Sequence, residues 1–317
     1  MPNVIVHIGL PKTGTTSLQA FLIENRQRLA EMGFAYQNPG LLGHSQVEFA
    51  LVASTQAGQL ARDRILRSHL GIATLDDQKK ITEKFEADFS DAVSQDPEAT
   101  FLISCEQISA WFRTKELRAA LNDWLEQRFG EIEYVIFARP TEKYILSVYS
   151  EAMKRGDTIG LDEFIAHRNE LPIARILSAW AQQFPGKVRV RMMPKSDRGT
   201  ELYEEFCAVS GIPLAGLTIP KVHNTSLTGR QINLLRHINK WIGPPAKRGP
   251  VRRRFALRIL KTVEALYKDG ARLTLNPDQK ARLNEKFPGS VEKTVRKLRG
   301  KETPLTERGW PVDPNTN

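Results

Sequence analysis

The sequence has little of what marks secreted, metal-binding or membrane-spanning proteins. Its 317 residues include only two cysteines, Cys105 and Cys207, which lie far apart in the chain. Such a pair suggests neither a disulfide framework nor a cysteine-based metal cluster. No apolar run approaches the ~20 residues that a membrane-spanning helix needs, and the first residues resemble a strand rather than a targeting signal. We therefore expect a cytoplasmic protein without a metal site.

The composition is otherwise ordinary except for its charge. Hydrophobic residues make up 41% of the chain and charged residues 26%, as in many globular proteins. The formal net charge of +10 implies an anionic partner. Nucleic acid, acidic lipid, an anionic cofactor and an anionic acceptor all satisfy that requirement, so the charge alone does not choose among them.

Short apolar runs alternate with helical patterns along the first two thirds of the chain. Strands are expected at 4–8, 34–36, 100–104, 132–138 and 187–192. Helices are expected at 15–32, 44–54, 59–69, 77–94, 141–155, 161–167, 173–184, 201–210, 228–241, 252–268 and 277–298. This order predicts an α/β fold with a mostly parallel sheet and helices on both faces.

Two domains are expected from the same pattern. Residues 1–220 form the α/β core, and residues 221–317 form a basic, helical C-terminal region. The helices within about 40–98 are interpreted as an insertion that caps the substrate, or alternatively as ordinary crossover packing. Ligands of parallel sheets bind at the carboxyl ends of the strands, and Gly9, Glu106 and Arg139 all lie at or just past such ends.

The segment from Gly9 to Ser17, GLPKTGTTS, is the clearest functional signal. A glycine-bearing loop between a strand and a helix points backbone amides at an anion. Gly9 and Gly14 have the spacing of the nucleotide-hydrolase loop, G-x-x-x-x-G-K-[ST]. However, Thr15 occupies the place of its lysine, and the only lysine is Lys12, within the loop. The segment is P-loop-like, but the position of its lysine argues against an ATPase or kinase.

Two segments together resemble the sulfotransferases that use 3′-phosphoadenosine 5′-phosphosulfate (PAPS). Pro11-Lys12-Thr13-Gly14-Thr15-Thr16 is similar to their 5′-phosphosulfate loop, P-K-[ST]-G-T-[ST]. Arg139 ends a strand and Ser147 follows eight residues later, as in their 3′-phosphate site. The resemblance implies that 11–17 binds the phosphosulfate and that Arg139 and Ser147 bind the 3′-phosphate. Ser17 is a departure, because many members have an adenine-stacking aromatic there.

The same resemblance implies a catalytic base near the sulfuryl group. Glu106 is the first candidate, since it ends a strand and since glycan- and tyrosine-directed members use a glutamate. The alternative is a structural glutamate engaged with backbone amides or Arg113. His44 is the second candidate, as base or as substrate contact. Lys12 is suited to stabilise the leaving phosphate.

The predicted activity is sulfuryl transfer from PAPS to an acceptor hydroxyl, with saccharides and glycolipids as candidate acceptors. Its rivals are a P-loop-type kinase or NTPase and a non-catalytic protein that binds anions or nucleic acid. We expect no nucleic acid, since no recognised motif is present. The basic stretch Lys247–Lys261 is either a solvated helix face or a contact for an anionic acceptor or a membrane surface. Asn224-Thr225-Ser226 is interpreted as a helix cap or a loop over the nucleotide. The oligomeric state is left open.

Overall fold

A computed structural model describes residues 1–37, 40–41, 43–193, 200–220, 227–242, 258–263, 265–266 and 270–300. The chain divides into two compact units. The first comprises Met1–Ala138, Ile173–Lys221 and Thr294–Asn317, and the second comprises Arg139–Pro172 and Val222–Lys293. This division combines segments differently from the expected domains 1–220 and 221–317, whose boundary stays a prediction.

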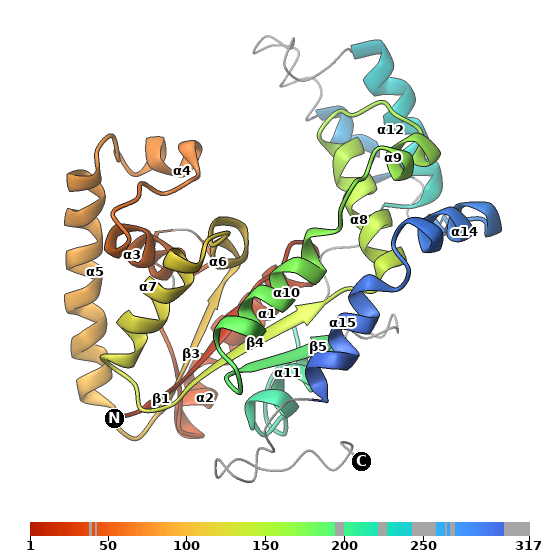
Figure 1. Ribbon diagram of the computed structural model, residues 1–317. Helices are drawn as coiled ribbons and strands as arrows, with labels where there is room; N and C mark the ends of the chain where they lie inside the picture. The colour runs from red at the N-terminus through yellow and green to blue at the C-terminus, as the bar shows by residue number, and fades with distance from the viewer. Residues whose placement is uncertain are drawn as a thin grey trace. The chain divides into compact units, whose positions relative to one another are not determined.

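The first unit is built on a five-stranded sheet with the strand order β2-β3-β1-β4-β5 (Figure 1). The strands are β1 (Asn3–Ile8), β2 (Phe34–Tyr36), β3 (Thr100–Cys105), β4 (Ile132–Ala138) and β5 (Val188–Met192). Every pairing between neighbouring strands is parallel. The α/β fold with a mostly parallel sheet that the sequence predicts is thus confirmed.

Helices cover both faces of this sheet. The helices of the first unit include α1 (Thr15–Glu24), α6 (Glu106–Trp111), α7 (Lys115–Glu126), α10 (Pro172–Gln183) and α11 (Glu201–Ser210). On one face, Tyr134 of β4 packs against Trp180 of α10 and donates a hydrogen bond to Asn122 of α7. On the other face, the next residue, Val135, joins a core with Phe21 of α1 and Phe206 of α11. Successive side chains of β4 point to opposite faces of the sheet, so the strand packs against helices on both sides.

The expected helix at 15–32 is interrupted. The structure has α1 up to Glu24 and a separate helix α2 at Arg26–Glu31. Between them, the Asn25 side chain donates hydrogen bonds to the carbonyl oxygens of Phe21 and Thr218 and accepts one from the Thr218 amide. Asn25 is thereby tied to a segment far away in the sequence, which the local periodicity does not reveal.

The segment between β2 and β3 is helical, as expected. It contains α3 (Glu48–Gln56), α4 (Arg64–His69) and α5 (Leu75–Gln95). Phe49 of α3 forms edge-to-face ring pairs with Phe89 of α5 and Trp124 of α7, and Phe89 stacks on Trp124. Such a buried aromatic cluster is typical of crossover helices packed on a core. The role of this segment as a substrate cap stays a prediction.

The second unit is helical. Its helices include α8 (Thr141–Lys154), α9 (Leu161–Ala166), α12 (Gly229–Ile242) and α14 (Pro277–Lys286), and α15 (Ser290–Arg299) begins in it. Tyr149, Met153, Phe164, Ile232 and Leu235 form its buried core. The single helix expected at 277–298 is wrong, because the chain ends α14 before Pro288 and passes through Gly289 with φ +59° before α15.

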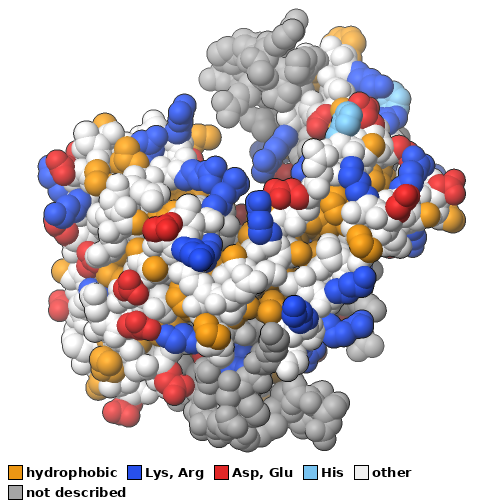
Figure 2. Space-filling view, viewed as in Figure 1, with side chains coloured by type: hydrophobic (Ala, Val, Ile, Leu, Met, Phe, Trp, Pro, Cys, Tyr) orange, Lys and Arg blue, Asp and Glu red, His pale blue; other side chains and the backbone are white. Residues whose placement is uncertain are grey.

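Some sequence-based expectations lie outside the described residues. These are Asn224-Thr225-Ser226 and the part of the basic stretch at 247–257. Within the part of the chain that the structure describes, every helix is too short or too polar to serve as a membrane span. The same part holds no group of three His, Cys, Asp or Glu side chains placed to bind a metal ion. Figure 2 shows acidic, basic and hydrophobic side chains mixed over the visible face.

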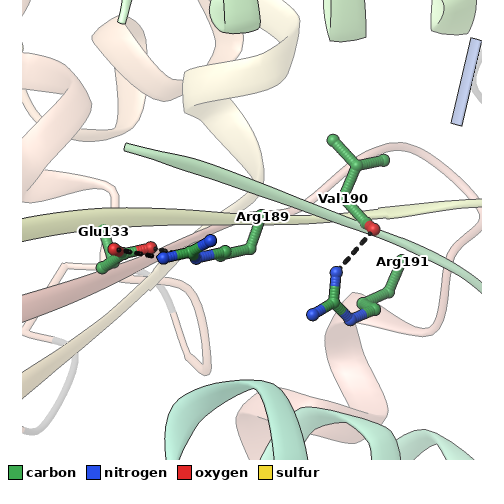
Figure 3. A network of polar contacts seen from close by, with 4 residues as sticks. All are labelled: Glu133, Arg189, Val190 and Arg191. Carbon is green, nitrogen blue, oxygen red and sulfur yellow. Dashed lines mark hydrogen bonds and ion pairs between the residues drawn. The ribbon is translucent and has the colours of Figure 1, made fainter. Parts of the chain in front are cut away.

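A buried ion pair joins the last two strands of the sheet. The Arg189 guanidinium on β5 donates to both carboxylate oxygens of Glu133 on β4, at 2.8 and 3.1 Å (Figure 3). Both side chains are at most 1% exposed. Next to this pair, Arg191 donates to the carbonyl oxygen of Val190 and pairs with Glu205. The first unit therefore carries charges in its interior that are stable only while they are paired.

We expect the Glu133→Leu variant to lose about 3–5 kcal/mol of unfolding free energy, because Arg189 is left charged and buried. The Glu133→Leu/Arg189→Met double variant, which removes both charges, should lose much less. Urea unfolding followed by circular dichroism measures both changes. A loss below about 1 kcal/mol for the single variant contradicts this description of the pair.

Candidate functional site

The loop between β1 and α1 has an unusual backbone. Lys12 has φ +68°, and it is the one described non-glycine residue with a positive φ. Gly14 follows with φ +76° and precedes the first residue of α1. A left-handed conformation costs a lysine roughly 1–2 kcal/mol, and such local strain concentrates at binding sites. The strain is therefore a first sign that this loop has a function.

Two threonine hydroxyls hold the loop in shape. The Leu10 carbonyl oxygen accepts hydrogen bonds from the Thr13 amide at 3.3 Å and from the hydroxyls of Thr13 at 2.8 Å and Thr15 at 3.3 Å. Thr13 and Thr15 are buried, whereas Pro11, Lys12 and Thr16 are exposed. The hydroxyls of the two buried threonines thus support the loop, and Lys12 and Thr16 are the polar side chains that it presents to solvent.

The start of α1 has no side-chain cap. Gly14 occupies the capping position and has no side chain that could accept a hydrogen bond. Within the described chain, the amides of Gly14, Thr15 and Thr16 donate to no carbonyl oxygen or side chain. The side chain of Ser17, in the first turn, lies near the Tyr203 hydroxyl. Uncapped amides at the positive end of a helix attract an anion.

Glu106 lies directly beside this loop. The Gly9 amide donates to the Cys105 carbonyl oxygen at 3.2 Å, and a Cβ atom added to Gly9 would lie 3.2 Å from the Glu106 Cα atom. The Ser109 hydroxyl lies 2.6 Å from the carbonyl oxygen of Gly9 and 3.0 Å from that of Glu106. Ser109 therefore fastens the start of α6 to the start of the loop.

Burial and a nearby cation act on the Glu106 carboxyl in opposite directions. Partial burial raises the pKa of Glu106 above its usual value, and the Lys12 ammonium lowers it by a smaller amount. The pKa that results is raised. No hydrogen bond or ion pair joins Glu106 to Arg113 in the described chain. Glu106 is thus a carboxyl group with a raised pKa next to this loop, a property that suits a general base.

The histidines of this unit differ in their surroundings. His44 is exposed, and the residues after it are fixed at the end of β3, because Ser45 bonds to Gln107 and the Gln46 amide donates to the Ser104 carbonyl oxygen. His44 therefore stays a candidate. His7 of β1 is buried, and burial lowers its pKa to about 3. A histidine held neutral in this way belongs to the core.

Arg139 and Ser147 belong to the second unit. Arg139 directly follows the last residue of β4, and Ser147 lies partly buried on α8. Burial lowers the pKa of Arg139, and the like charge of Arg272 lowers it further. Two guanidinium groups close enough to repel each other form a favourable place for an anion.

The structure thus brings together the Gly9–Gly14 loop, Glu106 and the chain next to His44 within the first unit. Two further residues of interest were not found from the sequence. Ser109 fastens the loop to α6, and Arg272 adds a charge near Arg139. Each acts across a large distance in the sequence, and neither is part of a local motif.

We expect the Gly9→Ala variant to lose about 1–3 kcal/mol of unfolding free energy through overpacking. Its new Cβ atom would lie 2.5 Å from the Thr15 Cγ2 atom. In a Thr15→Ala background the same change should cost less, since the obstructing atoms are gone. Gly229→Ala is the matched control, because its nearest atom lies 3.8 Å away. Equal effects of the two glycine substitutions in thermal unfolding would show that the contact at Gly9 is not tight.

Comparisons with known proteins add no assignment to this site. No protein-family model, no curated protein and no solved structure matches the chain. The description of the α/β fold and of the loop therefore depends only on the sequence and structure of this chain. The resemblance to PAPS-dependent sulfotransferases, carried by 11–16, Arg139 and Ser147, stays a prediction.

Proposed function

We propose that this protein transfers a sulfuryl group from PAPS to an acceptor hydroxyl. One observation carries the proposal: a strained, uncapped anion-binding loop with Lys12 lies beside Glu106, whose pKa is raised. An anion site and a tuned base on adjacent strands are what sulfuryl transfer needs, since it depends on positioning, charge stabilisation and proton removal.

Each residue has a defined part in the proposed reaction. The loop amides and Thr16 hold the 5′-phosphosulfate, and Lys12 stabilises the charge that develops on the leaving phosphate. Glu106 accepts the proton of the acceptor hydroxyl. The oxygen of that hydroxyl forms a bond to sulfur, and the bond between sulfur and the phosphate oxygen breaks. Adenosine 3′,5′-bisphosphate leaves. Arg139 and Ser147 are assigned to its 3′-phosphate, with Arg272 as a further cation near Arg139.

The position of the lysine supports this reaction over ATP hydrolysis. A nucleotide-hydrolase loop places its lysine after the second glycine, where this chain has Thr15. Thr15 is buried, and its hydroxyl donates to the Leu10 carbonyl oxygen. It therefore cannot replace a lysine that reaches a γ-phosphate. A kinase or NTPase is accordingly the weaker proposal.

The acceptor is proposed to carry an ordinary alcohol group, with saccharides and glycolipids as the candidate class. A base whose pKa is raised toward neutrality suits a weakly acidic hydroxyl, because a stronger base removes its proton more readily. The net charge of +10 favours an acceptor that is itself anionic.

We expect calorimetry to show binding of adenosine 3′,5′-bisphosphate without any metal ion. The Lys12→Ala variant should bind it about 10–100-fold more weakly, since a hydrogen bond to a charged group contributes roughly 1.5–3 kcal/mol. Lys115→Ala, at an exposed lysine on α7, is the control and should bind normally. Tighter binding of ATP with magnesium than of the bisphosphate would overturn the proposal.

We expect the Glu106→Gln variant to bind the bisphosphate normally and to lose about 10²–10⁴-fold in kcat, the usual contribution of a general base. The Glu116→Gln variant, at an exposed first-turn glutamate of α7, should keep its activity. Turnover of labelled PAPS with a panel of sugar acceptors measures both. Full turnover by Glu106→Gln would remove Glu106 as the base and leave His44.

The pH dependence should follow from the same carboxyl group. Only ionised Glu106 accepts a proton, so the rate falls as the pH drops through its raised pKa. Lys12 lowers this pKa, so the acid limb of the kcat/KM profile should move to higher pH in Lys12→Ala. Lys12→Arg, which keeps the charge, should leave the limb near its original position. An unmoved limb in Lys12→Ala would contradict the coupling.

A further inference from the structure

The positive charge of the protein is concentrated in one stretch of the second unit. Residues 229–263 contain ten lysines and arginines and no aspartate or glutamate. The whole chain has 46 basic and 36 acidic residues, so its excess of basic residues is also ten. The remainder of the chain is therefore balanced, and acidic side chains lie among basic ones over the face shown in Figure 2. The excess of positive charge in the chain therefore lies in this stretch.

An exposed tryptophan lies at the end of the first helix in this stretch. Trp241, on α12, is 80% exposed, whereas the other described tryptophans, Trp111, Trp124 and Trp180, are at most 6% exposed. The exposed side chain of Lys240 precedes it. An indole is a large apolar group that folded proteins normally bury for the most part. The exposure of this indole next to Lys240 suggests that a binding partner covers it.

A second basic helix packs against α12. Residues 258–263 are helical, and Val263 shares the buried core with Ile232 and Leu235 of α12. The Gln231 side chain donates to the carbonyl oxygens of Val263 and Leu266.

The start of α12 therefore meets the end of the second helix. Ile238 of α12 and Ile259 of the second helix pack against the same core, so the two helices belong to one packed cluster. Arg258 and Lys261 are exposed.

We propose that Trp241, Lys240, Arg258 and Lys261 form a surface that docks on an anionic lipid membrane. Lysine and arginine near such a surface are attracted to the lipid headgroups. Tryptophan prefers the layer between headgroups and acyl chains, where its ring is apolar on one side and its N–H stays wet. A soluble polyanion would match the charges but provides no apolar layer for the indole. The surface is independent of the proposed sulfuryl transfer.

Vesicle binding of the full chain tests this surface. Trp310, outside the described residues, is replaced by Phe in every protein so that Trp241 is the exposed fluorophore. Vesicles containing phosphatidylglycerol should sediment with the protein and shift the Trp241 emission to shorter wavelength. Vesicles of phosphatidylcholine alone should do neither. The Lys240→Ala/Lys261→Ala variant should bind about 25-fold more weakly, or about five-fold per lysine, which corresponds to ~1 kcal/mol each.

Matched variants decide the role of the indole. Trp241→Ala should weaken sedimentation with the anionic vesicles, whereas Ile65→Ala, at a 74% exposed isoleucine of α4, should not. The absence of both sedimentation and an emission shift with anionic vesicles would overturn the proposal. So would binding to heparin or duplex DNA that Trp241→Ala leaves unchanged while vesicles are not bound, because the basic surface would then serve a soluble polyanion.

Discussion

The pairing of β1 with β3 is the constraint on which the candidate site depends. The two strands are parallel and in register up to Ile8 and Cys105, so the next residues, Gly9 and Glu106, leave the sheet side by side. The absence of a side chain at Gly9 allows this approach, since a Cβ atom would meet Thr15 and the Glu106 backbone. The loop at Lys12 and the carboxyl group of Glu106 are thereby held together by the backbone alone.

That proximity gives the site its electrostatic character. Burial raises the pKa of Glu106, and the charge of Lys12 on the facing loop lowers that pKa by a smaller amount. A carboxylate fully paired with the lysine would be a weak base, and one without a nearby cation would take up a proton at a higher pH. The balance between the two effects leaves Glu106 with a raised pKa, which suits the role of base that we propose for it. Ser109 maintains this arrangement by bonding to both segments.

The sequence predicts the parts of the fold and site that depend on local patterns. The strand at 132–138 and the helix at 201–210 occur with those bounds, because apolar runs and periodicity determine them. The break at Asn25 was not predictable, since its partner Thr218 is distant in the sequence. Likewise, Ser109 and Arg272 reach Gly9 and Arg139 only through tertiary contacts. The break at Pro288-Gly289 did have a local signal.

The proposed function assigns the 5′-phosphate of PAPS to the loop at Lys12 and its 3′-phosphate to Arg139. Calorimetric titration of Arg139→Ala and of Lys12→Ala with adenosine 5′-phosphate and adenosine 3′,5′-bisphosphate tests it most directly. Arg139→Ala should lose affinity for the bisphosphate alone, and Lys12→Ala should lose affinity for both nucleotides. If Arg139→Ala binds the bisphosphate as well as the unmodified protein does, the two-phosphate assignment is contradicted.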